Sequence, residues 1–238
     1  MDYTMNHSPM SRTQVWSQIE NAIAEFDLLK HPFYQAWTAG TLTRDDLRRY
    51  AADYYHQVSS FPACLSALHS RLPDGSLRRA VLQNLSEEEL GPESHADLWL
   101  AFAEGMGATR DAVRGSVPSP TMAALTSAFR RIASESSPVA ALGAFYAYES
   151  QVARIAGIKA KGLRNNYGAD ARTCEYFTLH ATEDVRHSRV WSDQMDALLD
   201  AGASEEELLA AVRQAAQALW NALDGIHRPD PALAASAC

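Results

Sequence analysis

Residues with high helix propensity fill almost all of this chain, and short segments that contain proline or glycine separate them. Alanine, leucine, glutamate, glutamine and arginine favour helix over strand, and no alternating strand pattern competes with them. No internal repeat divides the chain. We therefore expect one all-α domain, a bundle of seven to eight helices, over residues 11–228. The flanking segments, 1–10 and 229–238, are expected to be flexible ends.

N-cap residues, prolines and glycines along the chain predict where the individual helices begin and end. Thr43 and Ser204 each precede a helical pattern in the manner of an N-cap, and Pro62 suggests a bend within a long helix. Eight of the expected segments are long, and 33–40 and 109–113 are short. The expected helical segments are 11–30, 33–40, 43–71, 76–92, 93–107, 109–113, 120–134, 138–164, 170–200 and 204–228.

Composition excludes several classes of protein. The hydrophobic fraction of 47% and the charged fraction of 21% are ordinary for a globular domain. A net charge of −8 without a basic stripe disfavours nucleic acid as a partner. The chain has no run of about 18 apolar residues, so no membrane span is predicted. The first residues lack the pattern of a secretory signal. The three scattered cysteines (Cys64, Cys174, Cys238) favour reduced thiols. We expect a cytoplasmic protein with no nucleic-acid or membrane partner.

The helix expected over 170–200 carries acids and histidines within an apolar stripe. Its residues recur at spacings of three and four and therefore share one face: Phe177, His180, Asp184, His187 and Trp191. Burying such groups is costly unless something pairs them, and a divalent metal binds both imidazole and carboxylate. Glu183 lies about 60° from this stripe and is a candidate to contact the ligand residues rather than the metal itself. A partly exposed face, with acids paired to Arg186 and Arg189, is equally compatible with this stretch alone.

Two other segments also place an acid or a histidine on an apolar face. Glu149 lies at the centre of the apolar face that recurs over 142–156. His95 lies on the buried side of its helix, and Glu88, seven residues earlier, would be nearly two turns away. Pro92 interrupts that helix, and a kink there would aim Glu88 inward. For either glutamate alone, an exposed side chain is the simpler interpretation.

Together, these residues form a ligand inventory for two metal ions with open positions for O2. The six candidates are Glu88, His95, Glu149, His180, Asp184 and His187. A zinc hydrolase needs fewer ligands, usually three per metal and a water. A ferritin-like bundle supplies two Glu-x-x-His pairs. This set has one acid-x-x-His pair, Asp184 and His187, which disfavours the ferritin-like fold.

The ligand pattern E-x6-H, then E, then H-x3-D-x2-H resembles that of the heme-oxygenase-like di-metal oxidases. The greatest similarity is to the branch typified by the chlamydial protein associating with death domains. It extends from "LKHPFYQAWTAGTL" through "YAADYYHQVSSFPACLSALHS" to "HATEDVRHSRVW". The resemblance implies a dinuclear iron or mixed manganese–iron site, with O2 and an external reductant as co-substrates. We do not transfer the branch's interaction with host death domains to this chain. The resemblance leaves open whether the chain forms a homodimer.

Members of this branch are implicated in making para-aminobenzoate for folate, with one of their own tyrosines as the source of the ring. The resemblance implies that Tyr34 in "HPFYQAW" is the sacrificed tyrosine and that Lys159 in "AGIKAKG" is the internal amino donor. Tyr50 and Tyr148 are further aromatic residues at matching positions. From the residues alone, the default expectation for Lys159 is a solvated side chain, and neighbouring Lys161 would serve equally well.

Several further functions stay open from the sequence. Thiaminase-type relatives use a nucleophilic cysteine just before the glutamate of this helix, but the chain reads "GAFYAYES" there and lacks that nucleophile. The pyrroloquinoline-quinone-synthase type is a cofactorless oxidase without the six ligands, so the complete set of acids weighs against it. The sequence also allows a same-fold oxidase that acts on a free small molecule, and a non-catalytic helical interaction protein.

Overall fold

The computed structural model describes residues 10–227, which form ten α-helices and one short 3₁₀ helix, with no strand in this range. The expected flexible ends lie outside the described residues, apart from Met10. The all-α prediction is confirmed, and the helix count exceeds seven to eight because the two short segments form separate helices. The elements are α1 (Arg12–Glu25), η1 (Leu28–Lys30), α2 (Pro32–Ala39), α3 (Arg44–Arg71), α4 (Ser76–Glu89), α5 (His95–Gly105), α6 (Arg110–Arg114), α7 (Pro120–Glu135), α8 (Pro138–Tyr167), α9 (Glu175–Asp200) and α10 (Glu205–Ile226).

Local side-chain hydrogen bonds explain where boundaries differ from the expected ones. The first expected helix breaks after Glu25, where Asp27 accepts from the backbone N–H of Leu29 and begins η1. α9 begins at Glu175 rather than near 170, because Asp170 accepts from the backbone and side chain of Thr173 and holds a turn. The N-caps predicted at Thr43 and Ser204 are confirmed, and α3 continues through Pro62 to Arg71.

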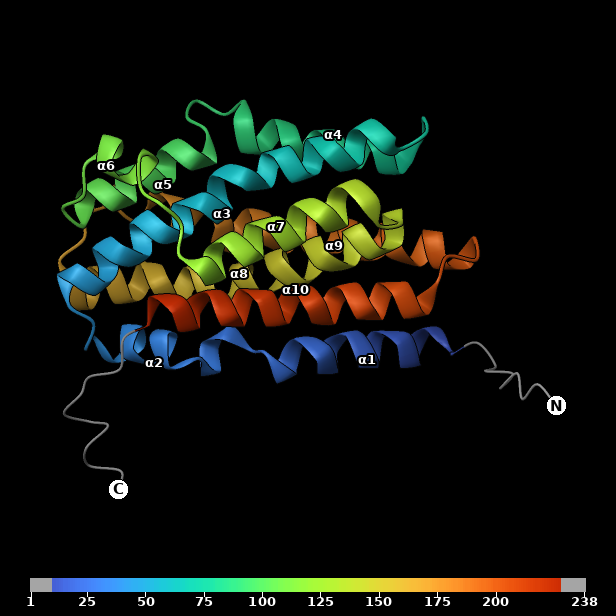
Figure 1. Cartoon of the computed structure of the whole chain (residues 1–238), viewed down its shortest axis with the longest axis horizontal. Helices are drawn as coiled ribbons and strands as arrows, with labels where there is room; N and C mark the ends of the chain where they lie inside the picture. Colours follow the sequence, from blue (N-terminus) through green and yellow to red (C-terminus); the bar gives the residue numbers. More distant parts are fainter. Residues whose placement is uncertain (1–9, 228–238) are drawn as a thin grey trace, which may run out of the picture.

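The long helices run along a common axis, as Figure 1 shows. α8 packs lengthwise against both α9 and α10, and α1 packs on the outer side of α10. α3 contacts α4, α5 and α7, and Figure 1 shows α3, α4 and α5 on the opposite side of α8 and α9 from α1. Over the described residues, no helix is both long and apolar enough to cross a membrane.

A cluster of buried aromatic rings joins α2, α3, α5 and α9 at one end of the bundle. Trp37, Tyr50, Trp99, Phe102 and Phe177 are each at most 1% exposed, and neighbouring rings meet mainly edge to face. Each such ring contributes about 1.5–3 kcal/mol by burial. This cluster fixes the short helix α2 against the rest of the molecule.

The docking of α2 on α8 depends on a glycine. A Cβ at Gly162 would lie 2.8 Å from ring atoms of Trp37, so only glycine allows this close approach. The Trp37 indole N–H donates to the carbonyl of Lys159, at 3.3 Å. α2 therefore presents Tyr34, three residues before Trp37, toward the side chain of Lys159.

Candidate metal centre

The six predicted ligand residues lie together in the interior, and each is between 2% and 5% exposed. They come from the end of α4, the start of α5, the middle of α8 and the first half of α9. The structure divides them into two triads, within each of which the potential ligand atoms lie within 4.8 Å of one another. One triad is Glu88, His95 and His180, and the other is Glu149, Asp184 and His187.

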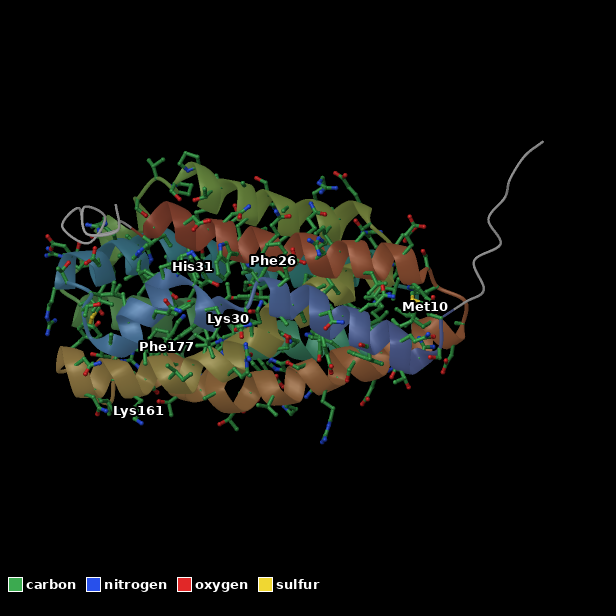
Figure 2. The ribbon with its side chains drawn as sticks, turned by 90° about the horizontal axis from the view of Figure 1, so that it is seen from below. Met10, Phe26, Lys30, His31, Lys161 and Phe177 are labelled. Carbon is green, nitrogen blue, oxygen red and sulfur yellow. The ribbon has the colours of Figure 1, made fainter. Side chains whose placement is uncertain are left out.

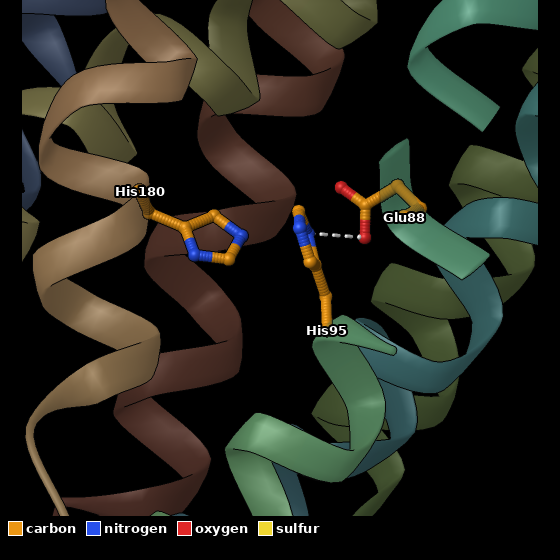
Figure 3. Close-up of side chains that lie close together, drawn as sticks. All are labelled: Glu88, His95 and His180. Carbon is orange, nitrogen blue, oxygen red and sulfur yellow. Dashed lines mark ion pairs between the residues drawn. The ribbon is translucent and has the colours of Figure 1, made fainter. Parts of the chain in front are cut away.

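The first triad joins three helices (Figure 3). Nδ1 of His95 lies 2.9 Å from a carboxylate oxygen of Glu88, but the contact lacks hydrogen-bond geometry. The rings of His95 and His180 are 4.5 Å apart between centroids. His180 donates from Nδ1 to the carbonyl of Tyr176, at 2.7 Å, because a carbonyl can only accept. This fixes the tautomer of His180 and leaves its Nε2 with a lone pair that is free to bind a metal.

In the second triad, side-chain donors from α4 and α9 hold Glu149, which lies on α8. The side-chain amide of Asn84 donates to Glu149 at 3.0 Å, and the indole N–H of Trp191 donates to the other oxygen. Nδ1 of His187 lies 3.4 Å from Asp184 and 3.7 Å from Glu149, again without a hydrogen bond. Glu149 is thus oriented by two donors, while a buried imidazole nitrogen beside it has no partner.

Burial perturbs the ionisation of these groups strongly. It raises the pKa of Glu149 to about 8. Burial, together with the nearby Glu88 carboxylate, raises the pKa of Asp184 well above its ordinary value. Burial, together with His95, lowers the pKa of His180 well below its ordinary value. Each shift disfavours the charged form, because a buried charge without a counterion is unstable.

This donor set fits a pair of first-row transition ions. The buried Nδ1 atoms of His95 and His187 have no hydrogen-bond partner, and a metal bond satisfies such an atom. Imidazole and carboxylate together suit iron, manganese and zinc. Two divalent cations would also neutralise three buried carboxylates, since no lysine or arginine among the described residues lies within ion-pair distance of them.

A small internal cavity of about 10 Å³ lies between the two triads. Two residues of each triad line it, together with side chains from α3, α8 and α9. It has room for roughly one water-sized molecule. The lining residues are Val58, Phe61, Glu88, Tyr148, Glu149, Tyr176, His180 and Asp184.

A second buried cluster contains three of the four predicted catalytic residues. The hydroxyls of Tyr34 and Tyr50 are 3.2 Å apart, and Nζ of Lys159 donates to the Tyr50 hydroxyl at 2.5 Å. Nζ also lies 4.8 Å from the centre of the Tyr34 ring. Burial lowers the pKa of Lys159 well below its ordinary value and raises the pKa of both tyrosines well above theirs. These shifts favour the uncharged amine and the uncharged phenols within this cluster. Tyr148, the fourth residue, lies instead at the cavity.

The default expectation of a solvated Lys159 is wrong. Lys159 is 5% exposed, whereas Lys161 is exposed and projects from the outer edge of the bundle (Figure 2). Lys161 therefore does not serve equally well. The reason is that the buried face of α8 is wide enough to include Lys159, about 80° from Glu149, whereas Lys161 lies on the exposed face of the same helix.

Sequence reasoning missed several residues that shape the site. Asn84 lies one turn before Glu88 on α4, and that spacing is a usable signal. Tyr176 stacks on the ring of His180 with centroids 3.9 Å apart. The sequence pattern identifies Trp191 only as the apolar end of a stripe, although its indole N–H holds Glu149.

The chain belongs to the family of iron-containing redox enzymes, whose family model matches residues 48–221. It is 40% identical over 220 residues to the 4-aminobenzoate synthase of Nitrosomonas europaea, covering 88% of this chain and 89% of that protein. It is 37% identical over 213 residues to the 4-aminobenzoate synthase of Chlamydia trachomatis, covering 89% and 91%. A domain of unknown function with a heme oxygenase-like fold, from Shewanella denitrificans, aligns with a TM-score of 0.74 at 18% identity, covering 92% and 93%. The predicted heme-oxygenase-like fold is confirmed.

Proposed function

We propose that this chain is a 4-aminobenzoate synthase that depends on O2, an external reductant and a dinuclear metal centre, either Fe/Fe or Mn/Fe. The ligands in this proposal are the two triads described above. Their burial, the imidazole nitrogens without a hydrogen-bond partner and the carboxylates without a lysine or arginine partner support it. The ions, when bound, supply the activation of O2, which protein side chains do poorly on their own. The 4-aminobenzoate synthases to which the chain is similar support the choice of product.

In this proposal, the ring of the product comes from the protein's own Tyr34. The product has seven carbons, a ring and one carboxyl carbon, and these match the ring and Cβ of a tyrosine side chain. Tyr34 is 3% exposed, and its hydroxyl is held by Tyr50. The fold therefore orients this ring without any binding of free substrate. The observation that carries the proposal is this buried tyrosine with a buried lysine amine 4.8 Å from the centre of its ring.

Lys159 supplies the amino group in the same proposal. An amine reacts through its nitrogen lone pair, which a protonated lysine lacks. Burial lowers the pKa of Lys159 and so favours the form of the amine that carries a free lone pair. Nζ lies 4.8 Å from the centre of the Tyr34 ring, so transfer needs only a local movement of a flexible side chain. A bond forms between Nζ and the ring carbon that carries the hydroxyl, while the ring C–O bond and the Nζ–Cε bond of Lys159 break. Cleavage of the Cα–Cβ bond of Tyr34, with oxidation of Cβ to the carboxyl, releases the product, and O2 and the external reductant balance the electrons.

Tyr50 and Tyr148 have supporting roles. Tyr50 contacts both Lys159 and Tyr34 through its hydroxyl and positions the amine relative to the ring. Tyr148 lines the cavity between the triads and limits the space there to one small molecule. Neither residue is consumed.

Mass spectrometry of the intact protein tests the proposal. Chains labelled with 13C in tyrosine and 15N in lysine are loaded with iron or manganese–iron and exposed to O2 and a reductant. We expect product that carries both labels, at no more than one molecule per chain, and a loss of mass that maps to Tyr34. Tyr34→Phe should reduce product at least about 100-fold, since a phenylalanine ring lacks the activating hydroxyl. Tyr55→Phe and Lys161→Arg are matched controls and should retain product.

Three outcomes would contradict this mechanism. Product formed while Tyr34 stays intact would exclude it as the source of the ring. More than one turnover per chain would instead indicate an oxidase that acts on a free small molecule. Protein that binds no transition metal and loses nothing on His187→Ala would support a non-catalytic helical protein.

A further inference from the structure

A third group of potential ligands shares one residue, His187, with the two inner triads. Glu87, Glu183 and His187 bring their ligand atoms within 4.8 Å of one another at the outer side of α9. The side chains of Glu87 and Glu183 are 31% and 36% exposed, whereas that of His187 is 2% exposed. This outer triad therefore joins two solvent-accessible carboxylates to one buried imidazole.

The guanidinium of Arg186 contacts the three side chains of the outer triad. One of its nitrogens, Nη2, contacts all three members: Glu87, an oxygen of Glu183 at 3.1 Å, and Nε2 of His187 at 3.1 Å. A nitrogen with these partners occupies the position that a bound cation would take. Arg186 is 41% exposed and can leave this position for solvent. Exposed ion pairs of this kind are weakly held, so exchange with another cation is inexpensive.

The imidazole of His187 belongs to both the outer and the inner group. Its Nε2 lies 2.7 Å from Glu87, while its Nδ1 has no hydrogen-bond partner and faces Asp184 and Glu149. A single buried ring thus separates the outer carboxylates from the inner triad. The distance between an outer and an inner cation position is therefore only the width of one imidazole.

A surface pocket of about 410 Å³ reaches the other triad from the same side. Four carboxylates line it, from Glu87, Glu93, Glu175 and Glu183, and His95 lies among its lining residues. Arg172 pairs with Glu93 and Glu175, and Arg186 pairs with the other two, so two arginines face four acids. The excess negative charge attracts cations. His95 is 5% exposed and belongs to the triad with Glu88 and His180, so the pocket reaches a residue of the inner centre.

We propose that Glu87, Glu183 and Nε2 of His187 form a loading site for a divalent transition cation, which Arg186 occupies until the cation arrives. The inference rests on the proposed metal centre. A hydrated cation enters the acidic pocket and displaces the guanidinium. It then exchanges water for carboxylate ligands before it passes to the inner triad. The exchange of one cation for another keeps the two outer carboxylates neutralised throughout.

Uptake of Mn²⁺ by metal-free protein tests this inference. The electron paramagnetic resonance signal of free aqueous Mn²⁺ disappears as the ion binds, and elemental analysis after gel filtration gives the final content. Glu183→Gln should slow uptake about tenfold, since it removes one attracting charge and one ligand, while the final content stays unchanged. Arg186→Gln should accelerate uptake because the competing cation is gone. Glu89→Gln and Arg189→Gln, exposed neighbours on the same helices, are the matched controls.

The outcomes separate this inference from the proposed metal centre. Uptake by Glu183→Gln and Arg186→Gln at the rate of the unsubstituted protein would overturn the loading site and leave the metal centre intact. A reduced final content in Glu183→Gln would also overturn it, because Glu183 would then be a permanent ligand. Unsubstituted protein that binds no Mn²⁺ would remove the metal centre itself, and the loading site with it.

Discussion

At the scale of single residues, Lys159 should reduce the stability of the fold at neutral pH. Its pKa in the native state lies well below that of an unfolded lysine, about 10.4, because it is buried. Between these two values the unfolded chain binds more protons, so the free energy of unfolding rises with pH. Lys159→Met removes this dependence. The variant should therefore be more stable at pH 7, and its advantage should shrink by about 1.4 kcal/mol per pH unit as the pH rises.

Urea unfolding of both proteins at pH 7 and pH 9 measures this difference. Lys161→Met is the control, since Lys161 is exposed and its substitution should give the same small change at both pH values. An equal stability difference at pH 7 and pH 9 for Lys159→Met would mean that the native lysine carries its proton.

Individual ligand positions could be predicted from the sequence only where one helix carries several of them. His180, Asp184 and His187 share a face by spacing, and the structure buries all three. Angles on an unbroken helix do not relate Glu88 to His95, because the two residues belong to separate helices joined by the turn at 90–94. Their proximity therefore comes from the chain reversal, which helical angles do not describe.

At the scale of helices, the close approach of α2 to α8 should depend on Gly162. Gly162→Ala would place a methyl group 2.8 Å from the fully buried ring of Trp37, which has no space to move. We expect a loss of about 1–3 kcal/mol in the free energy of unfolding, as for other overpacked cores. Product per chain should fall as well, because α2 carries Tyr34. Gly157→Ala on the same helix meets no atom within 4 Å and should stabilise the protein by about 0.5–1 kcal/mol.

Denaturant titration and product yield per chain together check this pair of variants. Equal stability of the two variants would show that the α2–α8 contact is not tightly packed. A full product yield from Gly162→Ala would show that the position of α2 does not matter for the reaction.

Helix limits could be predicted where a single residue type enforces them. Thr43 and Ser204 are N-caps in the structure because each hydroxyl accepts from a backbone N–H three residues later. The break after Glu25 was missed, because the apolar periodicity continues across it and the local Asp27 cap is reinforced by a buried contact with a distant residue. There, the backbone N–H of Leu28 donates to the side chain of Gln151, 123 residues away, at 3.0 Å. No local pattern encodes such a partner.

At the scale of the whole molecule, the assembly of four helices around two triads is not visible in the sequence. The depth of burial of Lys159 and the seating of Arg186 depend on how α4, α8 and α9 pack, and that packing is a property of the complete bundle. The resemblance to a known family supplied this information indirectly.

Metal binding should therefore stabilise the bundle as a unit. The proposed ligands come from α4, α5, α8 and α9, so bound ions would link helices that are far apart in the chain. A cation at 100-fold excess over its Kd adds about 2.7 kcal/mol to the free energy of unfolding, which for a domain of this size raises the Tm by about 5–10 °C. Calorimetry with Mn²⁺ and with a chelator measures the shift. His187→Ala should lose most of it and Glu135→Gln, on α7, should keep it. Equal Tm values with Mn²⁺ and with chelator would mean that these helices are not linked by metal.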